Sequence, residues 1–439
     1  MLVTKEKFIC ENISRSDNGE LCLANIPLRS LAEKYGTPFY AYDENRIRER
    51  CRTYLSAVRE AFDGNAKVMY ASKAASFRRL YEIMAEEGMG IDVVSSGEIH
   101  TAAIAGFPLE MAYFHSNNKT DADIAFAIEK GVGYFVVDNV EELYAIERIA
   151  GARGVTKKVL LRITPGIDPH TYSAVATGKV DSKFGSAIET GQAEEITRVA
   201  LSLPHVSLKG FHCHVGSQVF DSDVYIRTAD VMLSFVKSIN DNIGFLAEEL
   251  DIGGGLGVRY TEEQPSIDIA ENIKKVGAYM KMRAAELGIR LPEISFEPGR
   301  SIVADAAITV YTVGTVKRIP GYKTYVSVDG GMTDNPRYAL YGAPYTILPV
   351  SDEGYDDTEI CSVVGRCCES GDILQENVKM PKCIKRGDLI ATLTTGAYNY
   401  SMASNYNRIP RPPVVMLRDG ESYLAVRRES VEDITSLDV

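Results

Sequence analysis

Three stretches of the sequence carry side chains whose types suit one kind of chemistry. Lys73 follows an apolar run in Val-Met-Tyr-Ala-Ser-Lys-Ala, where a partly desolvated amine could form an imine with a carbonyl compound. The glycine run 253–255 follows another β-rich run, and the backbone N–H groups of such a loop can bind a phosphate. Glu297 and Arg300 follow a third run, as a carboxylate beside a guanidinium that suits a phosphate or a carboxylate.

A fourth stretch contains two histidines. His212 and His214 lie two residues apart in Gly-Phe-His-Cys-His-Val-Gly-Ser-Gln, so both face one side of the predicted strand. Such a pair could ligate a metal, but a metal site needs further ligands, and the remaining histidines form no recognisable pair with these two. We therefore expect no metal, and a histidine ring stacked on a flat cofactor is the better use of this position.

Taken together, these groups match the needs of one cofactor. A lysine amine, a phosphate-binding loop, a stacking histidine and a glutamate are what pyridoxal 5'-phosphate requires. A carboxylate opposite the pyridine nitrogen keeps that nitrogen protonated, so the ring becomes an electron sink. Each signal is weak alone, and the set predicts a pyridoxal-phosphate site.

The elements that position these groups alternate regularly between residues 38 and about 305. Eight β-rich runs alternate with amphipathic helical stretches, which predicts a parallel (β/α)₈ barrel, with an open doubly wound sheet as the alternative. The predicted strands are 67–70, 90–94, 112–115, 133–137, 158–163, 208–215, 248–252 and 293–296. The reactive residues follow these strands, at the rim where barrel enzymes place their active sites.

Outside this region the pattern changes. From about residue 306 short alternating β segments are separated by turn signals such as Pro-Gly and Asp-Gly, which predicts an all-β barrel or sandwich domain. We expect a barrel domain over 36–305 and a β domain formed by 1–35 and 306–439.

The composition restricts the class of protein. Forty-eight basic and sixty acidic side chains in 439 residues give a net charge of −12, which disfavours binding to nucleic acid or to anionic membranes. The eight cysteines show no CxxC spacing, as expected for reduced thiols in the cytoplasm. No signal peptide and no run of about 18 apolar residues is evident, so we expect a cytoplasmic protein.

Over nearly its whole length the sequence resembles the diaminopimelate decarboxylase family of fold-type III pyridoxal-phosphate enzymes, which have an alanine-racemase-like barrel. The resemblance rests on the stretches above, on Thr-Gly-Lys at 177–179 and on Asp-Ser-Lys-Phe-Gly at 181–185. In the β domain it rests on 337–342, on Cys-Glu-Ser-Gly-Asp at 368–372, and on Gly-Ala-Tyr at 396–398 followed by Ser-Met-Ala-Ser-Asn-Tyr-Asn. The Cys-Glu-Ser-Gly-Asp and Ser-Met-x-Ser-Asn-Tyr-Asn runs are specific to this branch.

The resemblance implies decarboxylation of meso-2,6-diaminopimelate to L-lysine and CO₂, the last step of lysine biosynthesis, by a homodimer with shared active sites. Lys73 would form the internal aldimine, His214 would stack on the ring, and Cys368 of the other subunit would donate a proton. The implied cofactor-binding residues are Lys73, His214, Ser217, Gly253, Gly254, Gly255, Glu297, Gly299, Arg300 and Tyr398. The implied substrate-binding residues are Arg300, Arg337, Tyr341, Glu369 and Tyr398.

The sequence departs from the family pattern at a few positions. It has Ser116 and Asn399 where glycine is common, Tyr338 where proline is usual, and Arg366-Cys367 before Cys368. The polar stretch 171–183 is a candidate for closing over the substrate. Two alternatives stay open at this point: a decarboxylase of another basic amino acid or a carboxylated polyamine, and a non-catalytic pyridoxal-phosphate-binding protein.

Overall fold

The computed structural model describes residues 8–168 and 181–439, so most of the stretch 171–183 lies outside the described residues. The chain divides into two compact units. Unit 1 comprises residues 1–49, 258–265 and 302–439, and unit 2 comprises residues 50–257 and 266–301.

Unit 2 is the predicted barrel. Among the described residues, eight parallel strands pair in the order β5-β6-β7-β8-β9-β11-β12-β13, and the pairing of β13 with β5 closes the ring. They are β5 (Ala66–Ala71), β6 (Gly90–Val93), β7 (Ala112–Phe114), β8 (Tyr134–Val137), β9 (Lys157–Thr164), β11 (Val206–His212), β12 (Glu249–Asp251) and β13 (Glu293–Phe296). The short β10 (Ser186–Ala187) pairs with the end of β9. This closure confirms the barrel and excludes the open sheet.

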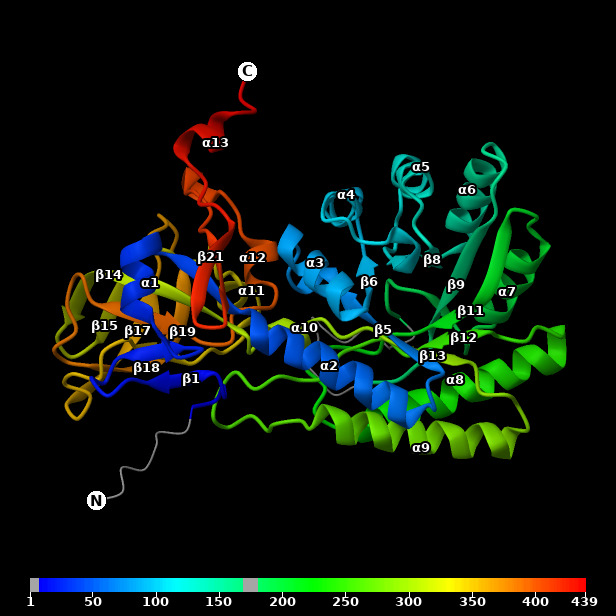
Figure 1. The fold of residues 1–439 in the computed structure, drawn as a ribbon, viewed down its shortest axis with the longest axis horizontal. Coiled ribbons are helices and arrows are strands. Elements are labelled where there is room, and N and C mark those ends of the chain that lie inside the picture. Colours follow the sequence, from blue (N-terminus) through cyan, green and yellow to red (C-terminus); the bar gives the residue numbers. More distant parts are fainter. Residues whose placement is uncertain (1–7, 169–180) are drawn as a thin grey trace. The chain divides into compact units, whose positions relative to one another are not determined.

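Helices flank these strands (Figure 1). They are α3 (Arg78–Glu87), α4 (Ser96–Ile104), α5 (Asp121–Lys130), α6 (Val140–Gly151), α7 (Gln192–Ser202), α8 (Ser222–Ile243) and α9 (Ile269–Leu287). Local sequence sets their ends: Asp268 accepts a hydrogen bond from the backbone N–H of Glu271 to start α9, and Gly288, at φ +65°, ends it. In the described part of the chain, no helix has the length and apolar character needed to span a bilayer.

Unit 1 is rich in β structure, as predicted. Its large sheet has the order β18-β17-β15-β14-β4-β20-β21, with β19 also pairing with β14 and with β16. The strands are β4 (Phe39–Asp43), β14 (Ala307–Ile319), β15 (Lys323–Val328), β16 (Ile347–Pro349), β17 (Thr358–Val364), β18 (Ile373–Pro381), β19 (Leu389–Thr392), β20 (Val414–Arg418) and β21 (Glu421–Val426). A separate small sheet contains β1 (Ile13–Arg15), β2 (Leu21–Leu23) and β3 (Ile26–Pro27).

Short helices complete this unit. They are α1 (Leu28–Tyr35), α11 (Arg337–Tyr341), α12 (Asn399–Met402) and α13 (Val431–Thr435), while α2 (Glu44–Ala61) and α10 (Arg300–Val303) run across the boundary between the units. One apolar cluster packs Leu28 and Leu31 of α1 against Phe39 and Val415. A second cluster is formed by β14, β15, β17 and β18.

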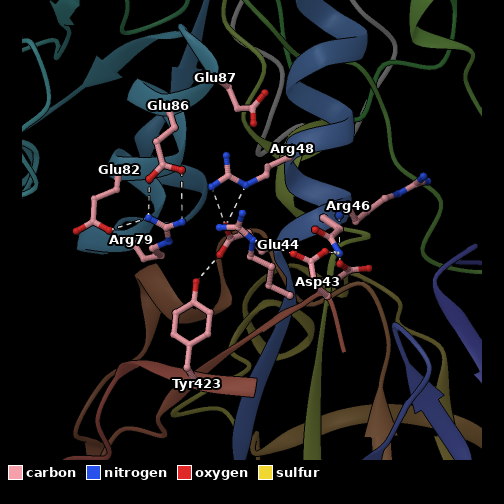
Figure 2. Close-up of polar contacts among 12 residues, drawn as sticks. Asp43, Glu44, Arg46, Arg48, Arg79, Glu82, Glu86, Glu87 and Tyr423 are labelled. Carbon is pink, nitrogen blue, oxygen red and sulfur yellow. Dashed lines mark hydrogen bonds and ion pairs between the residues drawn. The ribbon is translucent and has the colours of Figure 1, made fainter. Parts of the chain in front are cut away.

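A buried carboxylate ties the β20–β21 hairpin of unit 1 to the start of α2. Glu44 is fully buried, and its Oε1 accepts hydrogen bonds from Nε and Nη2 of Arg48 at 2.9 and 2.7 Å. Tyr423 donates its hydroxyl proton to Oε2 (Figure 2). Arg418 Nη1 lies 3.3 Å from Oε1. A buried charge is stable only when it is paired in this way, so these contacts fix the hairpin in place.

Candidate active site

The lysine predicted to carry the cofactor lies directly after the first barrel strand. Lys73 is in a single 3₁₀ turn, Ser72–Ala74, which follows β5. Its side chain is exposed, whereas Ser72 and Ala74 are buried. The amine is therefore carried by a fixed backbone at the C-terminal end of the barrel.

Glu297, directly after β13, contacts two histidines from other strand ends. His115 Nε2 lies 2.7 Å from Oε1, and His212 Nε2 lies 3.1 Å from Oε2. All three side chains are buried. Burial opposes the negative charge of Glu297, but the two histidines outweigh it and hold the pKa of this carboxyl well below its usual range.

Two further carboxyl groups face this cluster and behave differently. Burial, followed by the charge of Glu297, raises the pKa of Asp251 well above its usual range. Burial also raises the pKa of Asp92, to about 6, and its Oδ1 lies 4.0 Å from His115 Nε2. Of the carboxyl groups of Glu297, Asp251 and Asp92, that of Glu297 therefore has the lowest pKa and stays ionised.

The glycine loop packs so closely that side chains do not fit. A Cβ atom at Gly254 would lie 2.0 Å from the carbonyl oxygen of Glu297, and one at Gly255 would lie 2.1 Å from that of Gly216. Gly253, at φ +74°, donates its N–H to Oδ1 of Asp251 at 2.7 Å. A Cβ atom at Gly299 would lie 2.9 Å from the Cβ and 3.0 Å from the carbonyl oxygen of Ala71 in β5. The loop therefore needs glycine for steric reasons.

His214 lies in the loop after β11, because the strand ends at His212 and not at residue 215 as predicted. Its Nδ1 accepts a hydrogen bond from the N–H of Gly254 at 3.3 Å, which leaves the proton of the neutral ring on Nε2. Burial, then the positive charges of Lys73 and Arg162, lower the pKa of His214 well below its usual range. The imidazole is therefore neutral, which suits stacking on a flat ring.

Arg300 and Ser217 form the remaining polar pair of this region. Nε and Nη2 of Arg300 donate to the hydroxyl oxygen of Ser217 at 3.2 and 2.9 Å. Because that oxygen accepts both bonds, its own proton can be donated to an anion. Unit 2 alone thus brings together Lys73, His214, Ser217, the glycine run, Glu297, Gly299 and Arg300.

The other predicted residues belong to unit 1. Arg337 is 7% exposed, and its guanidinium carbon lies 5.3, 5.7 and 5.8 Å from the ring centres of Tyr260, Tyr345 and Tyr398. Tyr398 has φ +68°, a backbone conformation that is uncommon for a non-glycine residue. Tyr341, at the end of the same short helix as Arg337, is exposed.

Cys368 and Glu369 lie on the exposed turn between β17 and β18. The buried carboxylate of Asp372 supports this turn by accepting hydrogen bonds from the N–H groups of Met332 and Cys367, at 2.6 and 2.7 Å. The N–H of Cys368 donates to Asn407 Oδ1 at 2.9 Å, and Tyr406 Oη lies 3.5 Å from Glu369 Oε2. The two runs singled out in the sequence therefore contact each other.

Comparisons with known proteins agree with this arrangement. The pyridoxal-binding domain of the pyridoxal-dependent decarboxylases matches residues 44–304. Diaminopimelate decarboxylase of Bacillus subtilis is 44% identical over 97% of this chain and 96% of its own length, and that of Staphylococcus aureus is 42% identical over 96% and 98%. This chain belongs to the diaminopimelate decarboxylase family.

Solved structures show the same likeness. The crystal structure of diaminopimelate decarboxylase from M. jannaschii in complex with L-lysine has a TM-score of 0.91 and 31% identity, with 99% of each chain covered. A lysine/ornithine decarboxylase from Vibrio vulnificus, complexed with putrescine, is more distant, with a TM-score of 0.74 and 25% identity over 89% of this chain and 97% of its own.

The site fits the pyridoxal phosphate that this family uses. Oε1 of Glu297 is buried and accepts no hydrogen bond from any described residue, because the short contact with His115 lacks hydrogen-bond geometry. A buried ionised oxygen without a donor suits a protonated ring nitrogen. The Ser217–Arg300 pair supplies donors for a phosphate. In the glycine run, Gly255 is the residue whose N–H is not already bonded to a side chain among the described residues.

His115, Asp92 and Asp251 were missed by the sequence analysis. His115 was assigned to a strand and was not grouped with Lys73 or Glu297, although it also stands at a strand end. Its side chain, with those of His212 and Glu297, forms a set of potential metal ligands whose atoms lie within 4.8 Å of one another. In a diaminopimelate decarboxylase, the same carboxylate cannot serve a metal and a ring nitrogen at once.

The departures from the family pattern are locally accommodated. Ser116 has φ +141°, a conformation that favours glycine, and Lys119 donates a hydrogen bond to its carbonyl at 3.1 Å. Tyr338 directs its hydroxyl towards Glu376 at 3.4 Å. Cys367 has a raised pKa of about 12, because burial and the neighbouring Asp372 disfavour its thiolate. Asn399 is fully buried.

Proposed function

We propose that this chain, with pyridoxal 5'-phosphate, removes CO₂ from meso-2,6-diaminopimelate to give L-lysine. When bound, the cofactor supplies a ring that accepts the electron pair left as CO₂ departs. The membership in this family supports the reaction. The observation that carries the substrate assignment is Arg337, a buried cation without a carboxylate partner in the described part of unit 1.

The residues of unit 2 would hold the cofactor. Lys73 would bind its carbonyl carbon through the side-chain amine, and His214 would offer its neutral ring face. Glu297, held ionised by two histidines, would keep a proton on the ring nitrogen. Ser217, Arg300 and the N–H of Gly255 would bind the phosphate. Gly253, Gly254 and Gly299 would allow the chain to pack closely, and Tyr398 would add a hydroxyl.

The far end of the substrate carries both an ammonium and a carboxylate. Arg337, with Arg300, Tyr341 and Tyr398, would bind that carboxylate, and Glu369 would bind the ammonium. The far end of ornithine, a precursor of a diamine, carries only an ammonium group and needs only an acidic residue. A buried arginine is therefore specific to a substrate whose far end also carries a carboxylate.

The proton that replaces CO₂ would come from the Cys368 thiol. Cys368 and Glu369 are exposed on their own chain. An exposed thiol and carboxylate suit a homodimer in which each turn completes the site of the other copy. The active enzyme would then be a dimer with two shared sites.

A panel of amino acids tests this function. The purified protein with added cofactor should decarboxylate meso-diaminopimelate with a far higher kcat/KM than L-lysine, L-ornithine or L-arginine. A preference for one of those three would contradict the role of Arg337 and favour the other decarboxylases. Bound cofactor with no turnover of any substrate would favour a binding protein.

A further inference from the structure

The surroundings of Arg337 contain a second residue with an unused donor. Nη1 of Arg337 donates a hydrogen bond to the hydroxyl oxygen of Tyr345 at 2.7 Å. Nδ2 of Asn399 donates to the same oxygen at 3.2 Å. Tyr345 is 3% exposed and Asn399 is fully buried, so neither bond can be exchanged freely with water.

The hydroxyl of Tyr345 can therefore act further only as a hydrogen-bond donor. A phenol oxygen has at most two acceptor positions, and both are taken by Arg337 and Asn399. Its proton has no acceptor among the described residues of unit 1, and burial raises the pKa of Tyr345, so the proton is retained. Beside the guanidinium there is consequently an O–H donor that still needs an acceptor.

Aromatic rings surround the guanidinium of Arg337. Tyr260 and Tyr345 meet edge to face, with ring centres 5.2 Å apart and an interplanar angle of 88°. Arg337 lies over both rings, and its positive charge is attracted to their faces. Within the described part of unit 1 its only hydrogen bond goes to Tyr345, so that hydroxyl determines how the planar group is turned.

We propose that Tyr345, held by Asn399, is a specificity-determining residue that orients Arg337 and donates its own proton to the same distal carboxylate of the substrate. This inference rests on the proposed function, because it requires a ligand with a carboxylate at its far end. Asn399 stands where glycine is common in the family pattern, and glycine could not make the second hydrogen bond. The Asn399–Tyr345–Arg337 chain is then a feature of this sequence that increases its discrimination between amino acids and diamines.

Two ligands that differ only in this carboxylate provide the test. L-Lysine has the distal carboxylate, and cadaverine is the same molecule without it. In Tyr345→Phe, the inhibition constant of L-lysine and the KM for meso-diaminopimelate should each rise about tenfold, as expected for a lost hydrogen bond to a charged group. The inhibition constant of cadaverine, kcat and the visible absorption of the bound cofactor should stay within about twofold of wild type.

Tyr35→Phe is a matched control, since it removes a tyrosine hydroxyl of unit 1 whose one partner within residues 8–168 and 181–439 is Ser422. It should leave both inhibition constants unchanged. Asn399→Gly should weaken L-lysine binding less than Tyr345→Phe does, and the double variant should be no weaker than Tyr345→Phe, because both changes act through one hydroxyl.

Equal losses for L-lysine and cadaverine in Tyr345→Phe, or no loss for either, would overturn the inference. Additive effects of the two substitutions would overturn the part assigned to Asn399. These results are separate from the proposed function, which fails only if the unaltered protein does not decarboxylate meso-diaminopimelate.

Discussion

His115 and Glu297 are in contact although they follow different strands of the barrel, with 2.7 Å between Nε2 and Oε1. His212 contacts the other carboxylate oxygen, and its ring lies edge to face with that of His115 at 4.9 Å between centres. The two histidines stabilise a negative charge in a buried site where a lone carboxyl group would take up a proton. This arrangement places a firmly ionised group where the proposed function needs one.

Removing that charge tests the role of Glu297. Glu297→Gln keeps the size of the side chain but cannot hold a proton on a pyridine nitrogen. We expect kcat to fall by about 100-fold or more, with the protein folded and cofactor still bound. Glu293→Gln, at the start of the strand that precedes Glu297 and paired with Lys67, is the control and should retain wild-type turnover. Equal rates in both variants would remove Glu297 from the mechanism.

The pH dependence of turnover tests the contribution of His115. Its contact lowers the pKa of Glu297, so His115→Phe should raise that pKa and move the acid limb of the kcat profile upward by about one pH unit. Activity should consequently be lost first at low pH and kept at high pH. Asp92, Asp251 and His212 also face Glu297 and remain in the variant.

The control for this experiment is His100→Phe, which changes an exposed histidine on α4. Its profile should match that of the unaltered protein. An unchanged acid limb in His115→Phe would mean that His115 does not govern the ionisation of Glu297.

Substitution distinguishes the roles of the neighbouring residues Cys367 and Cys368. Cys368→Ala should strongly slow product formation while the cofactor remains bound, because the proton donor is gone. Cys367→Ala should have little effect, since burial and Asp372 raise the pKa of that thiol to about 12 and make it a poor proton donor. If Cys367→Ala were the slower variant and Cys368→Ala kept near wild-type turnover, Cys367 would be the proton donor.

Mixing two inactive variants tests whether the sites are shared. Lys73→Ala and Cys368→Ala chains, unfolded and refolded together, would form mixed dimers with one intact site in half of all dimers. We expect the mixture to recover about a quarter of wild-type activity. If mass spectrometry shows mixed dimers but almost no activity is recovered, both residues of a working site must come from one chain.

Much of the fold follows from the sequence because the periodic signals are strong. All eight barrel strands were predicted within two or three residues, since short buried runs alternate with amphipathic helices and glycine-rich ends. Three strands of the large sheet of unit 1 were missed: β4, β16 and β18. Phe39–Asp43 stands next to a helical stretch and pairs with β14 and β20, which are far away in sequence, so no local pattern indicates its partners.

The site was predictable only where a residue type has a marked chemical use. Lys73 and the glycine run were identified in that way. Tyr345 and Asn399 were not, because a buried tyrosine and a buried asparagine have many structural uses. Their role depends on hydrogen bonds between residues 337, 345 and 399, which three-dimensional packing alone brings together.

Release of CO₂ and L-lysine from meso-diaminopimelate is the most direct measurement of the central claim. The purified chain with added pyridoxal phosphate should form the two products in equal amounts, and formation should stop in Lys73→Ala. Absence of L-lysine, with the cofactor bound and its visible absorption present, would contradict the claim.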